Sequence, residues 1–221
     1  KPDGTVIGFI NTPTIVTIPI ERPQARFRLD DFAPVLNIVD DPGAIWVLPD
    51  SPIRSVADLV AEARRRPGRI SYGSGGVGVS NHLAVEIFAA ASGIDLLHVP
   101  YRGGAPAMQA LLAEEVQLSF VDTVTALPYL QSGELRALAV TTAQRAAQAP
   151  EVPTIAETVA PGYAAYGWTG LCGPAGLPEP ILRKVNADLN AILRDPAIGA
   201  RFIELGGTVA PGTPEEFAGF V

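Results

Sequence analysis

Short apolar runs of strand length alternate along the chain with stretches whose apolar residues recur at helical spacing. The strand-like runs are rich in Val, Ile, Phe and Tyr, end at Gly, Pro or Asp, and cover residues 5–10, 35–39, 45–49, 69–73, 96–100, 117–121, 135–141, 163–171 and 207–210. Helical patterns lie between Ser55 and Pro67, between Ser80 and Gly93, over 105–114 and 178–193, and from 213 onward. This alternation favours an α/β fold whose largely parallel sheets are covered on both faces.

Composition excludes several classes of function. The 221 residues carry a formal net charge of −7, which argues against nucleic acid as a partner. No apolar run approaches the ~20 residues of a membrane-spanning helix, and no signal-peptide pattern opens the chain. Cys172 is the single cysteine, and we expect it to pack in a buried strand; His82 and His98 lack metal-ligand spacing. We therefore expect no disulfide within the chain, no metal centre and no cofactor.

The most informative segment is the glycine-rich stretch Gly73–Gly78, which follows a strand pattern and precedes a helix pattern. Its four glycines let the backbone approach a ligand closely, and Ser80 is placed to cap the helix. The free N–H groups at such a helix start can hold a carboxylate without Lys or Arg, although the glycines could serve only as a tight turn. Leu96–Gly104 repeats the strand–turn–helix layout, so we expect both turns at the same carboxyl edge of a parallel sheet.

Residues in and near this segment also fit two enzyme patterns. Gly73, Gly75 and Gly78 match the spacing of a dinucleotide fingerprint, but the acidic residue at the right distance, Asp95, precedes its strand and so stands at the wrong edge. A Ser-His-Asp triad of Ser80, His82 and Asp122 lacks the nucleophile elbow. We therefore expect a binding protein rather than an enzyme.

Two further residues, Asp122 and Thr123, follow the strand pattern 117–121 and so fall at the same expected ligand edge. The Asp122 side chain could contact a ligand, or it could cap the next helix; the sequence favours neither. Tyr101 is a candidate aromatic contact in the second turn, although tyrosine at such a place is more often core packing.

Five ordered motifs together resemble one known family. They are Tyr72–Gly78 followed by His82-Leu83, then His98–Ala107, Leu135–Thr141, Val152–Glu157 and Gly170–Pro178. In this order they resemble the substrate-binding proteins of tripartite tricarboxylate transporters, the TctC or Bug family, over essentially the whole chain.

The resemblance implies a two-lobed periplasmic-binding-protein fold of the Venus flytrap type with two crossovers. It implies a periplasmic, monomeric receptor that holds a small carboxylate (a di- or tricarboxylate, an amino acid or an aromatic acid) and serves membrane permease subunits or a sensor. By the same analogy, lobe 1 comprises residues 1–45 and 168–221, and lobe 2 comprises residues 46–167. The ligand-binding positions that the resemblance implies are Thr12, Thr14, Ser74, Gly75, Gly76, Gly78, Val79, Ser80, Asn81, Tyr101, Asp122 and Thr123.

The chain also departs from the family pattern. Family members begin with a strand and a glycine-bearing loop that opens a helix, and neither precedes Lys1, so we expect lobe 1 to be incomplete, with its signal peptide outside this chain. Asn81 stands where many members have a small residue or proline. The alternatives left open are a nucleotide-dependent enzyme that uses the Gly73–Gly78 turn and a lobe that binds nothing.

Overall fold

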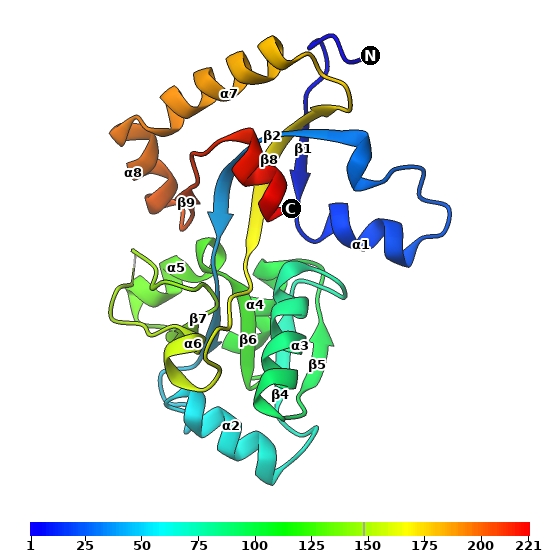
Figure 1. The fold of residues 1–221 in the computed structure, drawn as a ribbon. Helices are drawn as coiled ribbons and strands as arrows, with labels where there is room; N and C mark the ends of the chain where they lie inside the picture. Colours follow the sequence, from blue (N-terminus) through cyan, green and yellow to red (C-terminus); the bar gives the residue numbers. More distant parts are fainter. Residues whose placement is uncertain (148) are drawn as a thin grey trace. The chain divides into compact units, whose positions relative to one another are not determined.

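The chain folds into two compact units, each containing one sheet and its own helices (Figure 1). The structure is a computed structural model that describes residues 1–147 and 149–221. The first unit comprises residues 1–41 and 167–221, and the second comprises residues 42–166, so the chain crosses between them twice. The crossings expected near residues 45 and 167 therefore need a small correction, because Gly43–Ile45 pair with strands of the second unit.

The second unit is built on a five-stranded mixed sheet with the order β5-β4-β6-β3-β7. The strands are β3 (Gly43–Val47), β4 (Ser71–Ser74), β5 (Leu97–Pro100), β6 (Leu118–Asp122) and β7 (Arg136–Val140). β4 pairs in parallel with β5 and with β6, whereas β3 runs antiparallel to β6 and β7. The expected parallel pairing is therefore confirmed for β5-β4-β6 and is wrong for β3.

Helices cover both faces of this sheet, as the alternation of strands and helices predicts. One face packs against α2 (Val56–Arg65), α3 (Ser80–Ser92) and α6 (Ile155–Thr158), and its core includes Tyr72, Phe88 and Phe120. The other face packs against α4 (Gly104–Leu112) and α5 (Thr123–Ser132), with Trp46 and Met108 at its centre. Period-2 alternation along β3 sends Ile45 to the first core and Trp46 to the second.

Local signals explain where several of these helices start and stop. The Ser55 hydroxyl accepts a hydrogen bond from the Asp58 amide at 3.1 Å and so caps α2, as the sequence predicts. α3 ends at Gly93, whose φ of +61° is the left-handed conformation that glycine adopts at low cost. Thr154 and Glu157 form a capping box at the start of α6.

The first unit contains a four-stranded sheet with the order β1-β8-β2-β9, in which β8 runs antiparallel to β1 and β2, and β2 runs antiparallel to β9. Its strands are β1 (Gly8–Asn11), β2 (Phe32–Asp41), β8 (Gly167–Pro174) and β9 (Thr208–Val209). The largely parallel pairing expected from the alternation is thus wrong here, because β8 runs opposite to both of its neighbours, β1 and β2. Cys172 lies buried in β8, as expected.

The helices of this unit are α1 (Thr14–Glu21), the 3₁₀ turn η1 (Leu29–Asp31), α7 (Glu179–Leu193), α8 (Pro196–Glu204) and α9 (Pro214–Phe220). α1 and α8 are not among the helices that the sequence predicts. Leu182, Val185 and Leu189 of α7 pack on the sheet against Val35 and Leu36, which confirms the apolar stripe expected for that segment. Among the described residues, no helix is long and apolar enough to cross a membrane.

Candidate functional site

Three strand-to-helix turns meet at one edge of the second unit's sheet. β4 ends at Ser74, β5 at Pro100 and β6 at Asp122, and each strand leads into a helix, α3, α4 or α5 respectively. Because the three strands are parallel, these helices all begin at the same edge (Figure 1). The expectation that the first two turns share a carboxyl edge is therefore confirmed, and β6 brings a third turn to it.

Close backbone approach links the first two turns. The Tyr101 amide donates to the Ser74 carbonyl and the Gly103 amide donates to the Gly75 carbonyl, both at 3.0 Å. A Cβ atom on Gly75 would lie 3.5 Å from the Gly104 nitrogen. The start of α4 in turn approaches α5, since a Cβ atom on Gly104 would lie 3.2 Å from the Thr125 hydroxyl. The three helix starts therefore form one continuous surface.

The glycine-rich turn satisfies part of its own backbone. Ser74 is fully buried, and its hydroxyl accepts the Gly76 amide at 3.2 Å and lies 2.7 Å from Nε2 of His98. The Gly78 amide donates to Nδ1 of His82 at 3.1 Å. Gly76 and Gly78 have positive φ, +139° and +78°. The Ser74 hydroxyl and the amides of Gly76 and Gly78 therefore make hydrogen bonds that stabilise the turn itself.

The expected capping role of Ser80 is wrong, because the N-cap residue of α3 is Val79 and Ser80 is the first helical residue. Val79 has the extended backbone of an N-cap but no hydroxyl, and its side chain makes no capping hydrogen bond. The first-turn N–H groups of an α-helix have no partner within the helix. At α3 the first-turn N–H groups are those of Ser80, Asn81 and His82, one residue earlier in the chain than a Ser80 cap would place them.

Asn81 and Asp122 join α3 to the end of β6. Nδ2 of Asn81 donates to Oδ1 of Asp122 at 2.9 Å. Burial raises the pKa of the Asp122 carboxyl, and the Asn81 hydrogen bond opposes that rise. Asp122 occupies the N-cap position of α5 but makes no side-chain capping bond, so the capping interpretation of Asp122 is wrong.

Replacing Asn81 with alanine is expected to destabilise the second unit by about 1–3 kcal/mol at pH 7, because it leaves a buried carboxylate without its donor. The folded-state pKa of Asp122 is raised, so the folded state binds its proton more tightly than the unfolded state. Protonation removes the need for the Asn81 donor, and the cost of the substitution should shrink as the pH falls from 7 towards 4. Urea denaturation at both pH values measures this.

The control is the same substitution in an Asp122→Asn background, where no proton can be taken up at this position. There the cost of Asn81→Ala should not change with pH. An equal cost at pH 7 and pH 4 in the otherwise unaltered protein would contradict the assignment of this pair.

The remaining expected site residues fall into two groups. The Tyr101 hydroxyl donates to Oε2 of Glu115 at 3.4 Å, and its ring packs over Gly73, so the side chain is held by protein contacts. Thr123 is buried, and its amide donates to the Pro42 carbonyl at 2.8 Å. Thr12 and Thr14 belong to the first unit, where they follow β1 and Thr14 opens α1.

The geometry does not fit the dinucleotide fingerprint. Asp95 precedes β5, and its carboxylate lies near Gly68, which precedes β4. The acidic residue is therefore at the amino end of the strands, opposite the glycine-rich turn. Across the described residues, no group of three or more His, Cys, Asp or Glu side chains could hold a metal ion.

Sequence reasoning missed the part played by the two histidines and by Gly43 and Thr141. The Gly43 amide donates to the Thr141 hydroxyl at 3.1 Å, and a Cβ atom on Gly43 would lie 2.8 Å from Oδ1 of Asn81. Gly43 and Thr141 are 98 positions apart in the chain, so no local sequence pattern could have paired them. The histidines carried a signal, because each stands beside one of the two turns.

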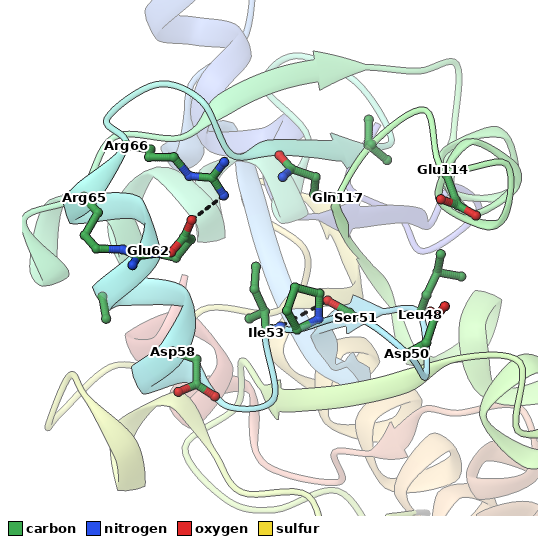
Figure 2. A pocket seen from close by; sticks show the side chains of 13 residues that line it. Leu48, Asp50, Ser51, Ile53, Asp58, Glu62, Arg65, Arg66, Glu114 and Gln117 are labelled. Atoms are coloured by element: carbon green, nitrogen blue, oxygen red, sulfur yellow. Dashed lines mark hydrogen bonds and ion pairs between the residues drawn. The ribbon is translucent and has the colours of Figure 1, made fainter.

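A cavity of about 680 Å³ lies elsewhere in the second unit, beside α2 and the residues before β6 (Figure 2). Leu48, Ile53 and Val116 give it apolar lining, and Asp50, Asp58 and Glu114 add carboxylates. Arg65 and Arg66 both pair with Glu62. Because Gln117 precedes β6 whereas Asp122 ends it, this cavity is not the surface formed by the three helix starts.

The two-lobed α/β architecture, with helix N-termini gathered at one sheet edge, defines the class of periplasmic solute-binding folds. Residues 1–215 match the family described as tripartite tricarboxylate transporter family receptor, TctC. The chain belongs to this family, as its motifs indicate.

Relatives and solved structures agree with the assignment. The chain is 37% identical over 219 residues, 98% of its length, to the UPF0065 protein in the tcbD-tcbE intergenic region of Pseudomonas sp. strain P51. It spans 65% of the length of that relative. Rpa4515 from R. palustris, solved with adipate, superposes with a TM-score of 0.83 at 32% identity. The match covers 98% of this chain and 73% of Rpa4515. MatC (Rpa3494) from Rhodopseudomonas palustris, solved with bound malate, superposes with a TM-score of 0.80 at 26% identity. The match covers the whole of this chain and 76% of MatC.

Proposed function

We propose that this chain is part of a periplasmic receptor that captures a small carboxylate and passes it to the permease of a tripartite tricarboxylate transporter. The observation that carries the proposal is the meeting of three helix N-termini at one edge of the second unit's sheet. Each N-terminus brings the positive end of a helix dipole to this edge, which favours an anion there. We propose binding rather than catalysis, because helix N-termini gathered at one edge stabilise a bound anion.

The contacts within the turn refine which groups would hold the ligand. The amides of Gly76 and Gly78 hold the turn itself, so we assign the carboxylate to the N–H groups at the starts of α3 and α4, where the helix dipoles are positive. Gly75 and Gly104 keep that surface free of side chains. Thr12 and Thr14 stay predictions from the family resemblance.

Asp122 gives the site a place for a donor group on the ligand. Its carboxyl is at the same edge, and Asn81 occupies one of its oxygens. A hydroxyl or ammonium group on the carbon beside a ligand carboxylate could donate to this side chain, whereas a second carboxylate there would be repelled. The family neighbours solved with adipate and with malate show that dicarboxylates of different length fit this fold.

Thermal unfolding of the full-length protein with a panel of acids tests the proposal. We expect at least one dicarboxylate at millimolar concentration to raise the melting temperature by several degrees, since a ligand at 100 times its Kd adds about 2.7 kcal/mol. Succinate, malate and aspartate differ only at one carbon and so report on Asp122. The matching diamide of each acid, which lacks the charge, is the control and should give no shift.

The panel has a clear negative outcome. If the melting temperature is the same with every acid and every diamide, the protein does not bind carboxylates at this edge. If acids and diamides shift it equally, binding does not depend on the charge that the helix N-termini are proposed to hold.

A further inference from the structure

Two histidines that are distant in sequence stack against each other behind the glycine-rich turn. His82 lies in the first turn of α3 and His98 in β5, and their ring centroids are 4.2 Å apart with an interplanar angle of 21°. On its other side His98 stacks on Tyr72 of β4, at 4.8 Å and 16°. The three rings form one row across β4, β5 and α3.

Each histidine is hydrogen-bonded to the turn. Nδ1 of His82 accepts the Gly78 amide at 3.1 Å, so this nitrogen carries no proton when the turn is formed. Nε2 of His98 lies 2.7 Å from the Ser74 hydroxyl, which itself accepts the Gly76 amide. The first and last parts of the turn are therefore both held by imidazole rings.

We propose that His82 and His98 are positioning residues that hold the carboxylate-binding turn in shape while both rings are neutral, so that mild acid weakens ligand binding. The inference rests on the proposed function for its consequence, because the turn leads into the α3 N–H groups assigned to the ligand. Its structural half, the dependence of the turn on neutral rings, stands on the contacts of the free protein.

Protonation acts against the turn in two ways. A proton on Nδ1 of His82 would point at the Gly78 N–H and break that hydrogen bond. Two charged rings stacked at 4.2 Å would also repel each other. Burial, and next the neighbouring His82, lower the pKa of His98, while Glu86 acts in the opposite direction.

The direction of the pH dependence follows from that lowered pKa. When the turn is disordered, His98 has the ordinary histidine pKa of about 6.5. When the turn is ordered, the pKa of His98 is lower. Between the two values the disordered state binds more protons, so order increases with pH. The ordered turn should be fully stable above about pH 6.5 and should weaken as the pH falls below that value.

Other titratable groups face the pair from the elements around it. From α3, Oε1 of Glu86 lies 3.7 Å from Nε2 of His82, but the Glu86 side chain is 58% exposed, so water screens its attraction for a charged ring. From β4, the Tyr72 hydroxyl donates to Glu86, and burial raises the pKa of Tyr72, which keeps it neutral throughout. β5 contributes His98 itself. Glu86 therefore reduces the effect without reversing it.

Nuclear magnetic resonance of the ligand-free, full-length protein tests the structural half. We expect the imidazole nitrogen shifts at pH 8 to show Nδ1 of His82 unprotonated. Between pH 8 and pH 5 the amide signals of Gly76 and Gly78 should move with the same midpoint as the His98 ring. The proposal would be overturned if Nδ1 of His82 carries a proton at pH 8. It would also be overturned if the amide signals of Gly76 and Gly78 do not change with pH.

Calorimetric titration with adipate or malate tests the consequence. Affinity should fall by roughly threefold or more from pH 8 to pH 5.5, because acid weakens the turn that leads into α3. His82→Asn and His98→Gln place amide groups where Nδ1 and Nε2 stand and cannot titrate. In the double variant the pH dependence should disappear, and at pH 8 His82→Asn should bind more tightly than His82→Leu, which has no acceptor.

Two outcomes separate this proposal from the proposed function. If the double variant keeps the pH profile of the unaltered protein, the histidines do not cause it and the inference is wrong. If no carboxylate binds at any pH, the proposed function fails, and the resonance measurements alone then decide whether the rings hold the turn.

Discussion

Replacing Gly76 with alanine is expected to lower the affinity for a carboxylate by roughly 10–100-fold. Gly76 has a φ of +139°, a conformation that costs a residue with a Cβ atom on the order of 1–3 kcal/mol. The new Cβ atom would lie 3.4 Å from the Tyr101 carbonyl oxygen, an ordinary van der Waals contact, so the expected effect comes from the backbone conformation rather than from a clash. The relaxed turn would lose the hydrogen bond from the Gly76 amide to Ser74 and displace the start of α3. Calorimetric titration with the acid found in the panel measures the loss.

Gly133→Ala is the matched control. Gly133 also has a positive φ, +78°, but it ends α5 away from the three turns, and a Cβ atom there would meet nothing within 4 Å. It should cost about 1 kcal/mol of stability and leave affinity unchanged. If both variants lose affinity equally, the loss reflects general destabilisation rather than the geometry of the turn.

The strand–turn–helix units of the second unit were predictable because each of their signals is local. A polar β4 segment runs into four glycines within six residues, and Gly93 stops the helix that follows. Parallel neighbours then place such turns at one edge by a general rule of α/β sheets. The residues named for the site from the sequence are consequently concentrated where the structure brings helix starts together.

What the sequence could not predict depends on distant partners. Gly8 pairs with Cys172 and Phe32 with Pro174, so the antiparallel sheet of the first unit is formed by residues more than 120 positions apart. α1 and α5 each contain a proline, at Pro19 and Pro128, and proline is a signal against a helix interior. The side-chain roles were hidden for the same reason, since Ser74 finds His98 and Asn81 finds Asp122 only in the fold.

The strongest effect on stability is expected for Gly170→Ala in β8. This strand lies between β1 and β2, and Gly170 pairs with Ile10 on one side and Asn37 on the other. A Cβ atom at Gly170 would lie 2.7 Å from the Leu36 carbonyl oxygen and 2.6 Å from Cε1 of Phe217.

Neither neighbour of Gly170 can move cheaply. The Leu36 oxygen is backbone of the neighbouring strand, and Phe217 of α9 is 3% exposed, with its ring 5.4 Å from Trp168 at 89°. Displacing a buried phenylalanine forfeits much of its packing, which is worth about 3–5 kcal/mol when the side chain is removed. We expect Gly170→Ala to destabilise the first unit by about 3 kcal/mol or more.

The two tryptophans allow this loss to be localised, because Trp168 lies in the first unit and Trp46 in the second. With Trp46→Phe as the background, Trp168 fluorescence reports urea unfolding of the first unit alone. Gly8→Ala is the control: it lies in the adjacent strand β1, and a Cβ atom there would meet nothing within 4 Å, so its midpoint should stay close to that of the background protein. An unchanged midpoint for Gly170→Ala would show that Phe217 and α9 do not pack on β8 as the structure has them. A midpoint shift confined to Trp168, and absent when Trp46 is the reporter, would in addition show that the two units unfold separately.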